Sequence, residues 1–184
     1  MQIYPTLYSF YLSLTRVRGG VFSFVGLGNF RRLFASADFY DSLRRTAVYA
    51  GSTLLLSVTL GLLLAVLLNR RNRLTPLYLT LIFVPWVLSD VVSGTMWRWM
   101  FQQSYGLVQV ALNPLLGGVS LFSNPAGAMA IVIAAAVWRT LAFTTLLFLA
   151  ALQLIPAEVV ESAALDGAGR WQTFWAITLP LLRP

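Results

Sequence analysis

Three long apolar stretches constrain the fold of this chain more than any other feature of its sequence. Residues 46–68 contain no charged side chain, while residues 77–97 and 128–152 contain one each, Asp90 and Arg139. A helix of about 20 apolar residues crosses the hydrocarbon core of a bilayer. Because backbone N–H and C=O groups must be paired internally in lipid, such stretches form helices. The sequence therefore predicts an all-α, polytopic membrane protein with these three stretches as its spans.

The scarcity and placement of charge favour a membrane protein and exclude several classes of function. Only 10% of the residues are charged, against about 25% in a soluble domain. The basic residues are all Arg, and almost all of them flank the apolar stretches in short groups, so we expect membrane lipid and no nucleic acid as a partner. The sequence lacks Cys, His and Lys, which excludes disulfides, imidazole metal sites and a Walker A loop. We therefore predict no catalytic residue, no metal and no cofactor in this chain, and do not expect it to be an enzyme.

The other segments are predicted to be connections or interrupted ends. Residues 3–14 are apolar and aromatic but too short to span a bilayer, so we expect further sequence before them, and likewise after Pro184. Residues 19–45 predict a surface loop with a short interfacial helix, residues 69–76 a tight basic turn, and residues 98–127 a connection with turns at Gly, Pro and Asn. The Arg residues lie almost evenly on both sides of the predicted spans, so charge alone does not determine the orientation.

Two charged side chains fall inside predicted spans. Placing a charge at the bilayer centre costs about 3 kcal/mol, so Asp90 and Arg139 are expected either to line a translocation path or to pair across helices. The alternative is that each lies near an interface or serves packing alone. Pro85 is expected to break the second span, because Pro frees a backbone carbonyl and permits a kink.

The segment 157–184 follows the last apolar stretch and is too polar and interrupted to be another span. Pro156 suits the first turn of a helix, Glu158 and Glu161 suit its N-terminal end, and Gly167 is a typical place for it to stop. Small residues spaced three or four apart would let this helix lie close to another backbone; they are Val160, Ala163, Ala164 and Gly167. A second helical pattern, typical of an interfacial helix, contains Trp171, Phe174, Trp175 and Thr178.

Ten residues at fixed spacing in this segment resemble the EAA loop, which marks the permease subunits of binding-protein-dependent ABC importers. They are Glu161, Ala163, Asp166, Gly167, Ala168, Phe174, Ile177, Leu179, Pro180 and Pro184. Ser162 stands where the family has its first Ala. Upstream stretches are similar to the sugar-transporting branch, related to the maltose and glycerol-3-phosphate permeases; they read YPTLYSFYLSLTR, FVGLGNFRRLF, LLNRR, VPWVLSDVVSGTMWRWMF and YGLVQ.

This resemblance implies a helical bundle of the type I importer (MetI-like) kind, with residues 1–184 forming an incomplete part of it. It implies a multi-pass protein of the bacterial or archaeal cytoplasmic (inner) membrane that imports a carbohydrate. The implied partners are an ABC ATPase dimer, a second and paralogous permease, and an extracytoplasmic substrate-binding protein. A same-fold permease for phosphate, polyamine or peptide, a non-transporting membrane scaffold and a decayed fragment are the alternatives.

The resemblance also assigns roles to the residues of the segment and gives the chain an orientation. In the family the loop is cytoplasmic, which places residues 69–76 and 157–184 inside and residues 19–45 and 98–127 outside. Docking to the ATPase subunit is expected from Glu161, Ala163, Ala164, Asp166 and Gly167. Anchoring of the loop is expected from Trp171, Phe174, Ile177 and Pro180.

Overall fold

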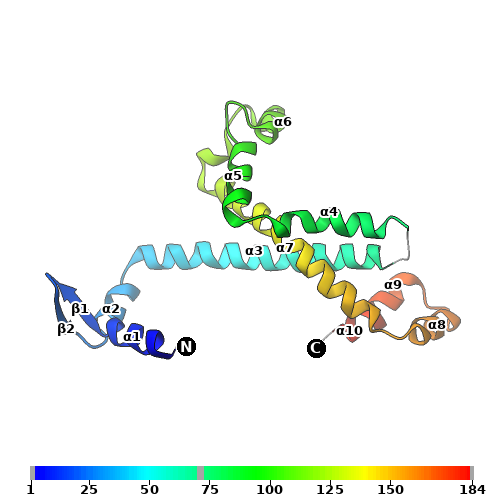
Figure 1. The fold of residues 1–184 in the computed structure, drawn as a ribbon, viewed down its shortest axis with the longest axis horizontal. Helices are drawn as coiled ribbons and strands as arrows, with labels where there is room; N and C mark the ends of the chain where they lie inside the picture. The colour runs from blue at the N-terminus through cyan, green and yellow to red at the C-terminus, as the bar shows by residue number, and fades with distance from the viewer. Residues whose placement is uncertain (1–2, 70–72, 183–184) are drawn as a thin grey trace. The chain divides into compact units, whose positions relative to one another are not determined.

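The computed structural model describes residues 3–69 and 73–182, so part of the expected basic turn, including Arg70 and Arg71, lies outside the described residues. The chain divides into two units, residues 1–48 and 49–184. Helices dominate both units, as the sequence predicts, but the first unit adds two short strands to the expected all-α fold. The long helix α3 (Ala37–Leu68) begins in the first unit and continues into the second (Figure 1).

The first unit contains a hairpin between two short helices. Helix α1 (Ile3–Ser13) leads into the antiparallel strands β1 (Thr15–Arg18) and β2 (Val21–Phe24), and helix α2 (Gly28–Phe34) follows. Gly19 and Gly20 connect the strands with φ angles of 56° and 82°, the positive values that a type I′ hairpin turn requires at both central residues. The prediction of a surface loop at 19–45 is therefore wrong in part. The expected short helix is present as α2, but the same range also contains β2 and the start of α3.

The second unit is built around α3 and α7 (Pro125–Gln153), the two described helices long and apolar enough to cross a membrane. These helices contain the predicted spans 46–68 and 128–152. Helices α4 (Thr75–Val87) and α5 (Asp90–Met100) both pack on α7. The connection that follows α5 contains α6 (Leu107–Leu116) and the 3₁₀ turn η1 (Leu121–Ser123).

The predicted span 77–97 is not one continuous helix. It is divided between α4 and α5, which are bent by 99° at Leu88 and Ser89, as in a broken span or a re-entrant loop. Pro85 does not cause the break, because α4 continues past it to Val87. The break coincides with a capping signal: the Ser89 hydroxyl accepts a hydrogen bond from the Val92 amide (3.3 Å) and Asp90 lies in the first turn of α5. A side-chain cap and an acidic first turn both stabilise a new helix start.

Small residues let α3 and α7 cross closely. Ser57, Gly61 and Ala65, spaced four apart, are the buried residues of α3. The Ser57 and Thr140 hydroxyl oxygens lie 3.0 Å apart. Figure 1 shows α7 crossing α3. A Cβ added to Gly61 would lie 2.9 Å from the Thr144 Cβ. Such stripes of small residues are typical of helix pairs packed in lipid, where close backbone contact supplies the attraction.

Substituting Gly61 by Ala should weaken this crossing. The new methyl group must displace Thr144 or push the helices apart, at a cost of about 1–3 kcal/mol. Gly51→Ala, on the same helix, is the matched control, because nothing lies within 4 Å of its added Cβ and Ala favours helix. Unfolding in mixed micelles, followed by tryptophan fluorescence, should show a lower stability for the first variant only. Equal stability of the two variants would contradict a close crossing at Gly61.

Candidate functional site in the polar C-terminal segment

Helix α8 (Ala157–Leu165) starts and ends where the sequence predicts. Pro156 is its N-cap residue, and Gly167 adopts a φ of +80° just past its C-terminus. The Gly167 amide donates to the Ala164 carbonyl (3.1 Å) and the Ala168 amide donates to the Ala163 carbonyl (2.9 Å). These two bonds form a Schellman motif, which satisfies carbonyls that the helix end leaves free. The left-handed residue at 167 therefore fixes the direction in which the chain leaves α8.

The two sides of α8 differ from the expected arrangement. Ala163, predicted to dock on a partner, is only 7% exposed, and Val160 and Ala164 line a pocket formed with other helices of this unit. Of the four small residues of the stripe, Ala163 is therefore buried in the chain itself, whereas Val160, Ala164 and Gly167 remain exposed. The opposite side carries Glu158, Glu161 and Leu165, all exposed and three or four positions apart. We name these three residues the outer face of α8.

Leu165 is the residue of this face that sequence reasoning missed. Its side chain is 89% exposed, an unusual position for a large apolar residue beside two carboxylates. The signal was present, because Leu165 follows Glu158 by seven positions and Glu161 by four and so shares their side of a helix. Of the other predicted docking residues, Asp166 and Gly167 are exposed at the C-terminal end of α8.

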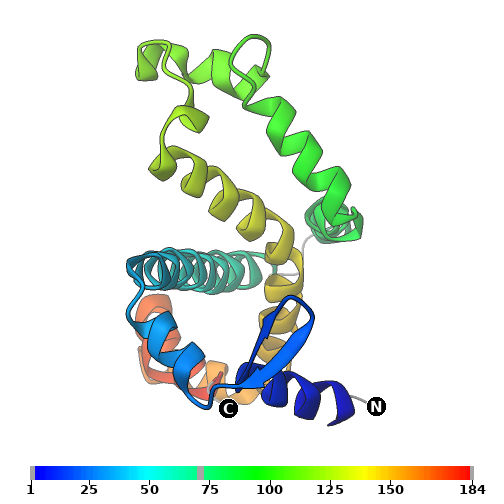
Figure 2. The ribbon, with the colours of Figure 1, turned by 90° about the vertical axis from the view of Figure 1, so that its left-hand side faces the viewer.

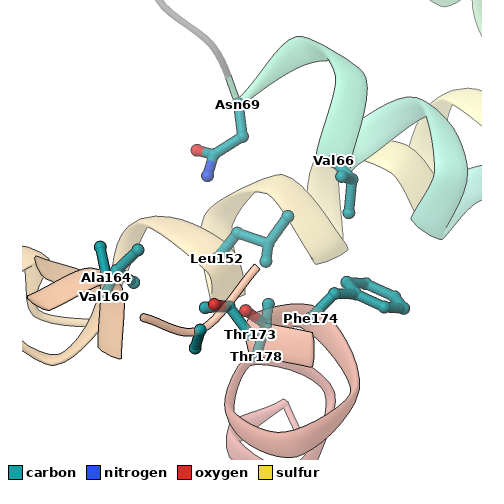
Figure 3. A pocket seen from close by; sticks show the side chains of 9 residues that line it. Val66, Asn69, Leu152, Val160, Ala164, Thr173, Phe174 and Thr178 are labelled. Atoms are coloured by element: carbon teal, nitrogen blue, oxygen red, sulfur yellow. The ribbon is translucent and has the colours of Figure 1, made fainter. Parts of the chain in front are cut away.

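A pocket of about 510 Å³ lies between α8 and the ends of the long helices. Figure 3 shows its lining side chains converging from four parts of the second unit. They are Val66 and Asn69 at the end of α3, Leu152 on α7, Val160 and Ala164 on α8, with Ala168, Thr173, Phe174 and Thr178 from the segment that follows. Most of these side chains are apolar, so the segment joins the long helices through a loosely filled apolar contact.

The segment after α8 holds the predicted aromatic anchors. Helix α9 (Arg170–Thr173), the π-helical turn η2 (Phe174–Thr178) and α10 (Leu179–Leu181) follow one another without a break. Trp171, Phe174 and Trp175 contact each other, with ring centroids 5.5–6.1 Å apart. Trp171 and Trp175 are 73% and 51% exposed, whereas Phe174 lines the pocket described above.

The end of the segment is attached to the long helices through Leu182, a contact that the sequence did not single out. Leu182 packs against the buried cluster of Ala65, Leu149 and Leu152. The π turn precedes Pro180, and the Leu179 amide donates to the Phe174 carbonyl, five residues earlier. Pro180 has no amide donor and crowds the carbonyl four residues before it, which favours a wider turn there. Ile177 faces a second pocket, of about 390 Å³, between the segment and α8.

Asp90 and Arg139 are brought together by the structure. An Arg139 guanidinium nitrogen forms an ion pair with an Asp90 carboxylate oxygen. Asp90 begins α5 at the bend, and Arg139 lies at the midpoint of α7. Of the interpretations that the sequence left open, pairing across helices is therefore observed. Within the described part of the chain, no three acidic side chains gather in a way that could hold a metal ion.

Comparisons with known proteins agree with this architecture. Residues 57–184 match the model of a family described as binding-protein-dependent transport system inner membrane component. The chain is 35% identical to the trehalose/maltose transport system permease protein MalF of Thermococcus litoralis, over 99% of this chain and 63% of that protein. It is 39% identical to the sn-glycerol-3-phosphate transport system permease protein UgpA of Yersinia pestis, over 88% of this chain and 55% of that protein.

Solved structures show the same fold. A chain of a bacterial ABC transporter involved in import of the acidic polysaccharide alginate superimposes with a TM-score of 0.84 at 26% identity, covering 98% of this chain and 62% of that one. The alginate transporter in complex with its pentasaccharide-bound periplasmic protein gives a TM-score of 0.81 at 25% identity, covering 98% and 61%. The chain thus spans about 55–63% of the length of these relatives. With a helical MetI-like fold and a family match over most of its length, this chain belongs to the family of binding-protein-dependent transport system inner membrane components.

Proposed function

We propose that this chain acts in the permease subunit of an ATP-driven importer, where α8 couples an ATPase to the membrane helices. The observation that carries this proposal is the arrangement of α8. Its outer face is exposed, its C-terminus is fixed by the Schellman motif at Gly167, and its inner side lines a pocket together with the ends of α3 and α7. A displacement of α8 can therefore reach α7 through the short connection 154–156, and both long helices through the following segment, whose Leu182 packs on Ala65, Leu149 and Leu152.

The proposed partners follow from the family. An ATPase dimer on the cytoplasmic side receives the outer face of α8, where Glu158 and Glu161 complement a basic cleft. ATP binding closes that dimer and α8 transmits the movement, so that the bundle opens alternately to each side of the cytoplasmic membrane. A second, paralogous permease completes the bundle, and an extracytoplasmic substrate-binding protein delivers the solute to the opposite side. Hydrolysis of ATP takes place in the separate ATPase subunit.

A carbohydrate is the proposed cargo. The support comes from relatives named for trehalose and maltose and from a fold match to an alginate importer, whereas other relatives are named for sn-glycerol-3-phosphate. Asp90 and Arg139 are candidate residues of the solute path in addition to their role as a pair. Uptake of maltose against sn-glycerol-3-phosphate and phosphate by the assembled transporter distinguishes these cargoes.

Crosslinking from Leu165 tests the coupling role. The sequence has no Cys, so single cysteines can be introduced at Leu165, which is 89% exposed, and at Ala163, which is 7% exposed. In membranes containing the assembled transporter, we expect Leu165→Cys to crosslink to the ATPase subunit at least about tenfold faster than Ala163→Cys, since rate follows exposure of the thiol. ATP should change the rate at position 165. Labelling of Leu165→Cys only by an impermeant reagent from outside the cell would overturn the proposal.

A further inference from the structure

The hairpin of the first unit has two chemically different faces. Its register pairs Val17 with Phe22 and Thr15 with Phe24 on one face, and Arg16 with Ser23 and Arg18 with Val21 on the other, because successive side chains of a strand point to opposite sides. We name Val17, Phe22 and Phe24 the apolar face and Arg16 and Arg18 the basic face, which also carries the exposed Val21. Figure 2 shows the hairpin projecting as an arm of the first unit.

The apolar face is at most half covered by the part of the chain that the structure describes. Val17, Phe22 and Phe24 are 52%, 53% and 73% exposed. An isolated two-stranded hairpin is only marginally stable in water, and two exposed Phe rings beside a Val add to the cost of leaving it there. The hairpin therefore needs a surface against which this face can pack.

The neighbouring helices indicate which surface is available. The end of α1 is fixed to the hairpin and α2: the Asn29 side-chain amide donates to the Ser13 carbonyl (2.8 Å) and the Thr15 carbonyl (2.7 Å). Helix α1 carries no charge and exposes most of its apolar side chains. On the other side, α3 begins at Ala37 and contains no charge from Thr46 onward. An uncharged apolar helix thus precedes the hairpin and the uncharged part of α3 follows it soon after, and this arrangement favours a position of the hairpin near the membrane surface.

The charges of this segment match an anionic surface. Between the two uncharged stretches lie six Arg and only two acidic residues, namely Arg16, Arg18, Arg31, Arg32, Arg44 and Arg45, with Asp38 and Asp41. Arg16 and Arg18 form no ion pair within the described residues. Guanidinium groups bind phosphate strongly, and basic segments next to a span are attracted to anionic lipid by about 1 kcal/mol per residue. The facing surface is therefore expected to carry phosphate.

We propose that the hairpin lies in the membrane interface and binds anionic phospholipid headgroups. The apolar face packs at the boundary of the acyl chains, a depth that places the phosphates level with or above the backbone. Arg16 and Arg18, on the opposite face, then reach these phosphates. With the orientation given under Proposed function, the hairpin binds the outer leaflet of the cytoplasmic membrane. The lipid site itself does not depend on the cargo or on the coupling role of α8.

Spin labels on adjacent residues of β2 test this proposal. Single cysteines at Phe22 and Ser23 point to opposite faces of the strand, and the chain has no other Cys. In the assembled transporter in phosphatidylethanolamine–phosphatidylglycerol vesicles, we expect the label at 22 to be relaxed by oxygen, which concentrates in lipid. The label at 23 should be relaxed by a water-soluble nickel chelate. A label at 22 that is shielded from both reagents indicates cover by a protein, and one that is as nickel-accessible as 23 indicates water; either result overturns the proposal.

The role of the two Arg side chains is tested in the same measurement. The double variant Arg16→Gln and Arg18→Gln should reduce the ratio of hairpins in the membrane interface to hairpins in water about tenfold or more in vesicles with phosphatidylglycerol. In phosphatidylcholine vesicles the substitutions should have little effect. Arg44→Gln with Arg45→Gln is the matched control, because it removes the same charge from the first half of α3, away from the Asn29 contacts that hold the hairpin. An equal loss in the control would show general attraction to the surface and would overturn headgroup binding by the hairpin.

Discussion

Replacing Gly167 by Val is expected to leave the protein in the membrane but to separate ATP hydrolysis from transport. Gly167 has a φ of +80° in the Schellman motif that ends α8, and a β-branched residue disfavours this conformation by about 1–2 kcal/mol or more. Crowding is not the reason, since nothing lies within 4 Å of an added Cβ. The end of α8 should therefore leave its native position in a large fraction of molecules.

The measurement is initial uptake together with substrate-stimulated ATPase activity in proteoliposomes of the assembled transporter. A shift of 1–2 kcal/mol corresponds to about 5–30-fold in the population of the native loop end, so uptake should fall about tenfold. Basal ATP hydrolysis should remain, because the ATPase sites lie on another chain in the proposed assembly. The stimulation of hydrolysis by solute should be lost in parallel with uptake.

Two further variants separate backbone conformation from other effects of substitution. Gly167→Asn should keep most of the uptake, because Asn tolerates left-handed φ values better than other non-Gly residues. Gly169→Val lies two residues away, where φ is not in the left-handed range and no atom lies within 4 Å of the added Cβ, and should be nearly silent. Normal uptake and normal stimulation in Gly167→Val would refute the coupling role of α8.

The parts of this structure that could be predicted from the sequence depend on local chemistry. The spans in α3 and α7 follow from length and absence of charge, since lipid permits little else. The limits of α8 follow from Pro156 and Gly167, whose backbone preferences act within a few residues. The Gly19–Gly20 turn between β-branched and aromatic residues was an equally local hairpin signal, but the sequence interpretation took residues 19–45 for a surface loop with a short interfacial helix, and the structure shows strands of four residues on each side of the turn.

The parts that could not be predicted depend on which elements meet in space. The small residues of α8 predicted a close approach to another backbone, and nothing local distinguishes a partner from the chain itself. In the structure Ala163 is buried within the chain, whereas Val160, Ala164 and Gly167 are exposed, so docking to a partner stays a prediction. Similarly, Pro85 was a reasonable candidate for the break in the second span. The bend is instead at Leu88 and Ser89, where capping and the contact of Asp90 with α7 favour a new helix.

Reversing either charge of the Asp90–Arg139 pair should destabilise the protein in a bilayer, and reversing both should restore it. The two side chains are 73% and 37% exposed in this chain, and in water an ion pair of that exposure contributes little. In the middle of a membrane an unpaired Arg or Asp costs about 3 kcal/mol. We therefore expect Asp90→Arg or Arg139→Asp alone to lower stability by about that amount, and the double exchange to recover most of it.

A double-mutant cycle in bicelles, with unfolding followed by tryptophan fluorescence, measures the coupling directly. Recovery of stability in the double variant Asp90→Arg with Arg139→Asp is the decisive quantity. This variant keeps one positive and one negative charge at the same two positions and only exchanges which position carries which charge. A double exchange no more stable than the worse single variant would contradict a direct ion pair. The neutral combination Asp90→Asn with Arg139→Gln then separates the remaining roles: a pair that only joins α5 to α7 should tolerate loss of charge with uptake intact. Charges that also contact the solute should give a stable protein with uptake reduced about tenfold or more, since a lost charge-assisted hydrogen bond is worth about 1.5–3 kcal/mol.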